Sequence, residues 1–155
     1  MKLWVECRFA PYAASHRDVA RLANRTVFRG RPTYEAFGEQ AFDVQAAVFN
    51  LSHGAAAVGH VRTIVPDGQG WWIADALVDV PDDHPCIDEI RRRVVPGARI
   101  SPAFSIVDED CENLNGTYVS FVRACDLLEI SLLERGDIAG YTDARILSAR
   151  EPRVR

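Results

Sequence analysis

A single strand-rich domain of the mixed α+β class is the fold that this sequence predicts. The chain has 155 residues, of which 48% are hydrophobic and 26% are charged; this is long enough to bury a core and ordinary for a globular domain. Short apolar runs bounded by turn residues outnumber stretches with helical periodicity. We place the domain at residues 1–148 and a flexible polar tail at residues 149–155.

Turn signals separate several of the strand-like runs. The segment Pro66-Asp67-Gly68-Gln69-Gly70 is rich in turn-forming residues. The pair Asn115-Gly116 is typical of a tight hairpin. In chain order, the strands are expected at residues 2–8, 44–51, 58–65, 71–80, 100–107, 117–123 and 127–133.

Fewer stretches are expected to be helical. Ser15 and Asp18 suit the first turn of one helix, and Asp82 and Asp83 can cap another. Pro96-Gly97 ends the second helix. The expected helices are residues 13–24, 82–95 and the ambiguous segment 34–42, interrupted at Gly38; the expected loops are residues 26–32, 108–115 and 136–140.

Charge and composition exclude several classes of protein. The net charge is −4, which argues against a nucleic-acid surface. The run Arg91 to Arg93 falls in the last turn of a predicted helix, where it complements the helix dipole. No apolar stretch approaches the ~20 residues that span a bilayer. The charged N-terminus lacks the apolar centre of a secretory signal, so we expect a cytoplasmic protein.

The cysteines and histidines do not have the spacing of a metal site. There is no Cys-x-x-Cys pair, and the histidines do not form paired ligands. Free thiols are therefore expected, with no metal or cofactor. The cysteines are Cys7, Cys86, Cys111 and Cys125.

Three polar residues lie beside separate apolar runs and together predict hydrolase chemistry. They are His53, Ser101 and Glu129. A serine hydroxyl becomes a nucleophile when a base lies about 2.6–3.2 Å away and a third group orients that base. Pro102 biases Ser101 toward an extended backbone, so this nucleophile would lie on a strand. Asp126 competes with Glu129 for the third role.

Each of the three residues also has a purely structural interpretation. Ser101 can be a small polar residue of a strand. His53 can be a turn residue, and Glu129 can be the solvent-facing residue of a half-buried strand. From the residues alone, both interpretations stay open.

Six segments, in this order and spacing, carry a resemblance to a known family. They are Gly38-Glu39-Gln40-Ala41-Phe42, Val48-Phe49-Asn50-Leu51-Ser52-His53, Val58-Gly59-His60-Val61, Gly70-Trp71-Trp72-Ile73-Ala74-Asp75-Ala76-Leu77-Val78-Asp79, Arg99-Ile100-Ser101-Pro102-Ala103-Phe104 and Asp126-Leu127-Leu128-Glu129-Ile130-Ser131-Leu132-Leu133. Through them the chain resembles the prohead maturation proteases of tailed bacteriophages, from about Phe28 to Ile146.

The resemblance implies a function and a fold. It implies a serine endopeptidase with Ser101 as nucleophile, His53 as general base and Glu129 as third member. The implied fold is that of herpesvirus assemblin, a mostly antiparallel barrel surrounded by a few helices. The implied substrates are the major capsid protein, the scaffold region and the enzyme itself, inside the assembling prohead in the host cytoplasm. No cofactor, nucleic acid or membrane is implied, and a homodimer is left open.

Three departures from the family pattern support an alternative. Gly54 follows His53 where the family commonly has Asp. Pro102 and Ala103 follow the serine, and Pro102 removes a backbone N–H beside the nucleophile. The residues after the last strand, Glu134 to Asp137, replace a Pro-Ala-Asn-Pro-like segment. The alternative is a catalytically impaired relative that acts as a capsid-assembly or scaffolding factor.

Overall fold

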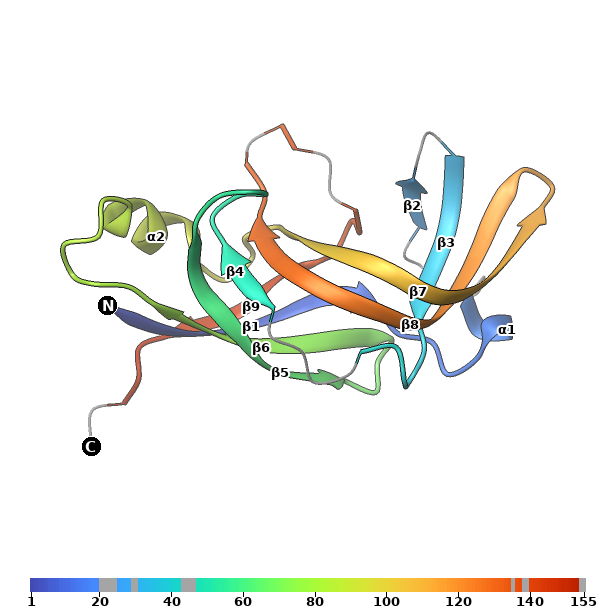
Figure 1. The fold of residues 1–155 in the computed structure, drawn as a ribbon, viewed down its shortest axis with the longest axis horizontal. Coiled ribbons are helices and arrows are strands. Elements are labelled where there is room, and N and C mark those ends of the chain that lie inside the picture. Colours follow the sequence, from blue (N-terminus) through green and yellow to red (C-terminus); the bar gives the residue numbers. More distant parts are fainter. Residues whose placement is uncertain (20–24, 29–30, 43–46, 135, 138–139, 154–155) are drawn as a thin grey trace.

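Strands of one mixed sheet make up most of the molecule. The computed structural model describes residues 1–19, 25–28, 31–42, 47–134, 136–137 and 140–153. The elements of this part of the chain are β1 (Lys2–Pro11), α1 (His16–Val19), β2 (Arg25–Phe28), β3 (Arg31–Phe37), β4 (Val48–Asn50), β5 (Ala57–Pro66), β6 (Trp71–Asp79), α2 (Ile87–Arg93), β7 (Ile100–Leu114), β8 (Thr117–Leu132) and β9 (Arg145–Arg150). The two helices lie at opposite ends of the molecule (Figure 1).

The predicted strand-rich α+β class is confirmed at this coarse level. The sheet has nine strands in the order β2-β3-β8-β4-β5-β6-β1-β9, with β7 also paired to β8. Most pairs are antiparallel, and β8 is parallel to both β3 and β4. Within the described residues the end strands β2 and β9 do not pair with each other, so the sheet is open and no barrel closure is observed.

Strand β8 is the axis of this arrangement. One edge pairs with β7 along almost its whole length, and the other edge pairs with β3 near its start and β4 near its end. The two predicted strands at residues 117–123 and 127–133 are therefore one strand. Segments that are far apart in the sequence become neighbours along it.

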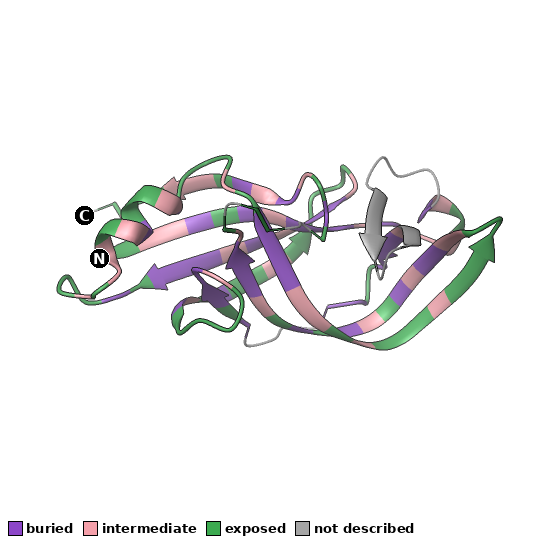
Figure 2. Cartoon of the chain, turned by 90° about the horizontal axis from the view of Figure 1, so that it is seen from above, coloured by how far each residue is buried: buried purple, intermediate pink, exposed green. Residues whose placement is uncertain are grey.

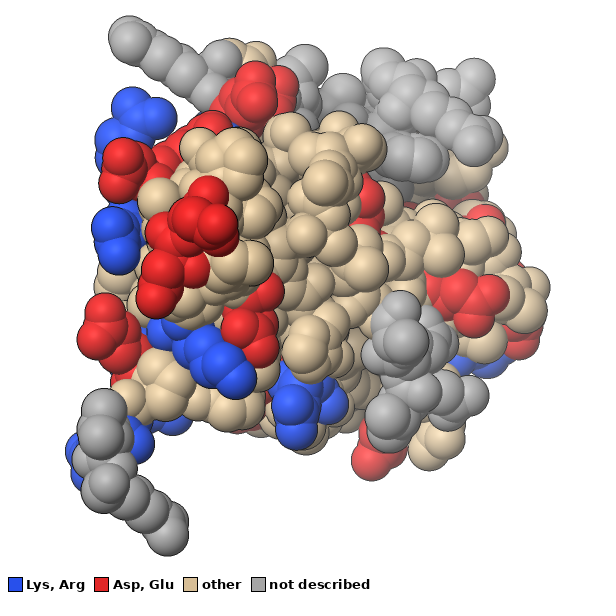
Figure 3. All heavy atoms as spheres, turned by 60° about the vertical axis from the view of Figure 1, so that its left-hand side comes forward, with Lys and Arg blue, Asp and Glu red and all other residues tan. Residues whose placement is uncertain are grey.

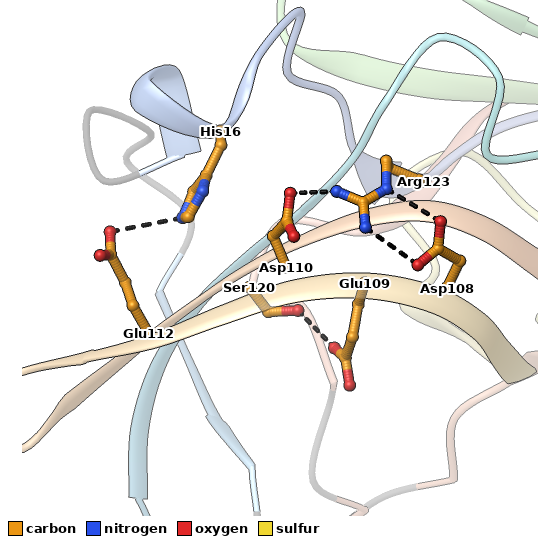
Figure 4. A network of polar contacts seen from close by, with 7 residues as sticks. All are labelled: His16, Asp108, Glu109, Asp110, Glu112, Ser120 and Arg123. Carbon is orange, nitrogen blue, oxygen red and sulfur yellow. Dashed lines mark hydrogen bonds and ion pairs between the residues drawn. The ribbon is translucent and has the colours of Figure 1, made fainter.

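The acidic loop expected at residues 108–115 is instead the outer half of β7, which is a correction. Arg123 lies at a register shift of the β7–β8 ladder and reaches both Asp108, at 2.9 and 3.0 Å, and Asp110. The Ser120 hydroxyl donates to Glu109 at 2.6 Å. These cross-strand contacts, drawn in Figure 4, compensate the clustered carboxylates and allow extended pairing.

Both helices are shorter than predicted. Helix α1 begins at His16, and the rest of the predicted helix over residues 20–24 lies outside the described residues. Helix α2 begins only at Ile87. Neither Asp82 nor Asp83 caps it, because its N-cap residue is Cys86. The Asp82 carboxylate instead accepts a hydrogen bond from the N-terminal ammonium group at 2.8 Å.

Three further predictions were wrong because long-range pairing overrides local propensity. The link at residues 26–32 and the helix at residues 34–42 are replaced by β2 and β3, and β3 is held by its parallel ladder with β8. The tail predicted to begin at residue 149 is shorter than expected. Ala149 and Arg150 belong to β9 and pair with β1.

Strand β7 is buried at its start and exposed over most of its outer half, so the far end of the β7–β8 hairpin is exposed (Figure 2). Aromatic rings form a large part of the core. Phe42 contacts Phe37 and Trp72 at ring-centroid distances of 5.0 and 5.2 Å. The Trp72 indole N–H donates to the Phe37 carbonyl oxygen at 3.1 Å, which satisfies its buried polar atom.

Gly59 is required where β5 approaches β6. A Cβ at this position would lie 2.3 Å from the Leu77 carbonyl oxygen and 2.8 Å from the Val78 Cα. Both atoms are backbone and cannot move aside without disturbing the ladder. We therefore expect Gly59→Ala to lower the free energy of unfolding by about 1–3 kcal/mol.

Urea denaturation measures this effect. His60→Ala, an exposed neighbour on the same strand, is the matched control and should stay within about 0.5 kcal/mol of wild type. Equal midpoints for wild type and Gly59→Ala would contradict the close approach.

Candidate active site

Three neighbouring strands bring two predicted site residues, Ser101 and Glu129, into rows that lie two residue pairs apart on one face of the sheet. Asn50 of β4 lies beside Ser131 of β8, and Ser131 lies opposite Ser101 of β7. In the other row, Glu129 of β8 has Val48 on one side and Ala103 on the other. Because side chains at positions i and i+2 of a strand share a face, Glu129 and Ser131 point to the same side of β8.

Two ladders near this face, β4–β5 and β7–β8, have irregular registers. The β4–β5 register shifts between Phe49 and Asn50, and the β7–β8 register shifts between Ala103 and Phe104. Such bulges turn side chains away from their regular directions and are frequent beside functional sites.

A tight turn after β4 presents His53. The Ala55 N–H donates to the Ser52 carbonyl oxygen at 3.2 Å, and Gly54, at the third position of the turn, has φ +71°. This left-handed backbone conformation favours glycine. The turn therefore explains why Gly54 follows the histidine.

Both oxygens of the Glu129 carboxylate have hydrogen-bond partners. Oε1 lies 2.5 Å from Nδ1 of His53 and accepts the hydroxyl of Ser131 at 2.9 Å. Oε2 accepts the side-chain amide N–H of Asn50 at 2.8 Å. Burial by itself would raise the pKa of Glu129. The hydrogen bonds that it receives, together with the His53 charge, outweigh burial, and the pKa lies below its ordinary value.

An ionised Glu129 determines which ring nitrogen of His53 carries a proton. A carboxylate can only accept, so Nδ1 donates the hydrogen bond, and in the neutral form of the imidazole the lone pair is then on Nε2. The His53 side chain is 46% exposed and the Glu129 side chain 16%. The imidazole is thus held from one side and accessible from the other.

Ser101 lies next to this cluster but is not hydrogen-bonded to it. Ser101 is 7% exposed, and no hydrogen bond joins its hydroxyl to His53 or to another described residue. Gly140 comes close to the hydroxyl, because a Cβ built on Gly140 would lie 3.7 Å from Ser101 Oγ. Pro102, the next residue, is buried and has no N–H to donate.

A hollow of about 370 Å³ opens beside the imidazole. Its lining includes residues from the segment that follows β8. The described lining residues are Ser52, His53, Leu133, Glu134 and Asp137.

The structure separates the two candidates for the third role. Glu129 contacts His53, whereas Asp126 is exposed and lies opposite Ser105 on another part of the ladder. The sequence reasoning missed Asn50 and Ser131. Two signals were present: an amide inside the apolar run of β4, and a hydroxyl two residues after Glu129.

Two arginines of α2 form ion pairs within their own helix, Arg91 with Asp88 and Arg93 with Glu89. Arg93 also donates to the Leu133 carbonyl oxygen at 3.4 Å. Acidic and basic side chains are interspersed on that end of the molecule (Figure 3). Among the residues that the structure describes, no group of three metal-ligating side chains forms and no helix is long and apolar enough to cross a membrane.

A buried pair anchors the chain beside Gly140. The Tyr141 hydroxyl donates to Oε1 of Glu35 at 2.5 Å, and both residues are buried. Burial raises the pKa of the Glu35 carboxyl above its ordinary value against the lowering effect of this hydrogen bond, and the Glu109 charge adds to the rise. The pair links the backbone beside Ser101 to β3.

Tyr141→Phe should lower the free energy of unfolding by about 1–3 kcal/mol, because it leaves a buried carboxyl group without its donor. Thermal and urea denaturation at neutral pH measure the change. Tyr12→Phe is the control, since the Tyr12 hydroxyl makes no hydrogen bond to a described residue. A Tyr141→Phe protein as stable as this control would show that the bond contributes no net stability.

Comparison of the chain with protein-family models, with curated proteins and with solved structures finds no match.

Proposed function

We propose that this chain is a serine endopeptidase of the prohead maturation type. The observation that carries the proposal is the contact between His53 and Glu129, with Nδ1 and Oε1 2.5 Å apart. The register of the β7–β8 ladder supports it as well, because Ser101 lies opposite Ser131, two residue pairs along the ladder from Glu129. The family likeness of the sequence supports the same residues in the same roles.

The proposed reaction is acyl transfer to Ser101. Oγ of Ser101 attacks the peptide carbonyl carbon while its proton moves to Nε2 of His53, and Glu129 stabilises the resulting imidazolium. The imidazolium then protonates the leaving amine as the C–N bond breaks, which leaves an ester on Ser101. Water, deprotonated by His53, hydrolyses this ester and regenerates the serine.

The proposed substrates follow from the resemblance alone. They are the scaffold region and the major capsid protein, with self-cleavage, inside the assembling prohead in the host cytoplasm. An assemblin-like barrel is part of the same proposal. The strand-rich, mostly antiparallel sheet supports this part of the proposal, although the sheet is open within the described residues.

Co-expression with the major capsid protein tests the proposal. Wild type, Ser101→Ala and Ser105→Ala are compared by the intact masses of all products. Ser105 is an exposed serine four residues further along β7 and is the matched control. Shortened capsid protein or enzyme is expected with wild type and Ser105→Ala only. Identical processing by Ser101→Ala would overturn the assignment.

One observation favours a second function, a non-catalytic capsid-assembly factor with the same fold. The Ser101 hydroxyl is nearly buried and has no hydrogen bond to His53. A fluorophosphonate reagent distinguishes the two functions, because an activated serine is labelled and an unactivated one is not. Absence of label on Ser101, with unchanged masses and normal head assembly, would favour the assembly role.

A further inference from the structure

Asn50 is the buried polar group that the reaction above leaves without a role. It ends β4, is 2% exposed, and donates through its amide nitrogen to Oε2 of Glu129 at 2.8 Å. Its amide oxygen is buried and has no hydrogen-bond partner among the residues that the structure describes. Burying a half-satisfied amide costs stability. The interior of a strand is therefore an expensive place for this residue unless its N–H is needed.

The two oxygens of the Glu129 carboxylate have different hydrogen-bond partners, and the bond from Asn50 keeps each oxygen facing its own partner. Oε1 accepts hydrogen bonds from His53 and Ser131, whereas Oε2 accepts one from Asn50. Rotation about the terminal torsion of a glutamate is soft, so a carboxylate held at one oxygen only can turn away from its partner. A donor on each oxygen holds the carboxylate plane in one orientation.

The register of the parallel β4–β8 ladder explains why the Asn50 side chain can contact Glu129. Asn50 lies beside Ser131 in the β4–β8 register, and Glu129 is two residues earlier on the same face of β8. The amide therefore extends diagonally to the neighbouring row. His53 follows three residues later in the same chain segment, so one short piece of chain supplies both His53 and the group that orients the histidine's partner.

We propose that Asn50 is the positioning residue of this site, holding Glu129 so that Oε1 faces Nδ1 of His53. The effect of Asn50 on catalysis rests on the proposed function, whereas its orientation of the Glu129 carboxylate does not. Asn50 does not touch the reacting atoms. It acts through Glu129, and so it should influence kcat rather than substrate binding.

The first test needs no substrate. The side-chain carboxyl carbon of Glu129 is titrated by ¹³C NMR in the full-length wild type, in Asn50→Ala and in Asn113→Ala. Asn113 is an exposed asparagine of the β7–β8 turn and serves as the matched control. Loss of a donor to the carboxylate should move the Glu129 midpoint upward in Asn50→Ala only. A midpoint identical to wild type in a folded Asn50→Ala protein would overturn the proposal.

A second measurement covers the case in which Asn50→Ala does not fold. In wild type, the side-chain amide protons of Asn50 should shift with the same midpoint as the Glu129 carboxyl carbon. Amide signals that do not change with pH would overturn the proposal without any variant.

Kinetics then separate this inference from the proposed function. In a Ser101-dependent cleavage assay, Asn50→Ala should lower kcat about 10- to 100-fold with KM nearly unchanged. Equal kcat values for Asn50→Ala and wild type would overturn the catalytic part. A wild type without Ser101-dependent cleavage would overturn the proposed function, while a shifted Glu129 midpoint would still support the hold of Asn50 on Glu129.

Discussion

Ser101→Ala and His53→Ala are each expected to lower kcat by about 10⁶-fold, and the double variant should be no slower than either single variant. The nucleophile and the base act as one unit, because the hydroxyl is a poor nucleophile unless its proton has an acceptor. Once one member is lost, the other has nothing left to contribute. Non-additive losses are thus a stronger signature of this pair than either loss alone.

Single-turnover cleavage of a peptide spanning the mapped capsid site measures these rates. His60→Ala is the matched control, because His60 is an exposed histidine of the adjacent strand that pairs with Val48 rather than with the site residues. It should retain the wild-type rate. Losses that multiply in the double variant, or full activity in His53→Ala, would contradict the assigned pair.

Glu129→Gln should lower kcat by about 10⁴-fold with little change in fold. The neutral amide cannot stabilise an imidazolium. It can also present its NH₂ group to Nδ1, which favours the tautomer with the proton on Nε2. That tautomer cannot accept the proton of Ser101.

Asp126→Asn is the control for this prediction. Asp126 is the nearby acid that the sequence left as a competitor, and it is exposed and away from His53. The rate should stay within about twofold of wild type, since an exposed acid away from the reacting groups contributes little. The opposite pattern, with Asp126→Asn inactive and Glu129→Gln active, would reassign the third role.

The local sequence predicted strands best where apolar runs end at strong turn signals. Strands β5 and β6 match their expected ranges to within about two residues, since the turn at Pro66 to Gly70 separates them. It was less reliable where polar residues lie in a strand. The acidic half of β7 looked like a loop because its compensation by Arg123 and Ser120 comes from another strand.

For the site, the sequence identified residue types and their chemistry but not their contacts. His53, Ser101 and Glu129 were selected as polar residues beside apolar runs. Their neighbourhood depends on β8 pairing with β7 and β4 at the same point. Asn50 and Ser131 can be recognised as hydrogen-bond donors to Glu129 only once that register is known.

The sequence by itself predicted the strand-rich class, the turns at Pro66 to Gly70 and Asn115-Gly116, and the residues that we propose for acyl transfer, because these follow from local composition and side-chain chemistry. Only the tertiary structure decided that Glu129 rather than Asp126 contacts His53, and that Asn50 holds Glu129. Those outcomes depend on strand register. Register is set by pairing between distant segments, and a shift of one residue would turn each side chain to the opposite face.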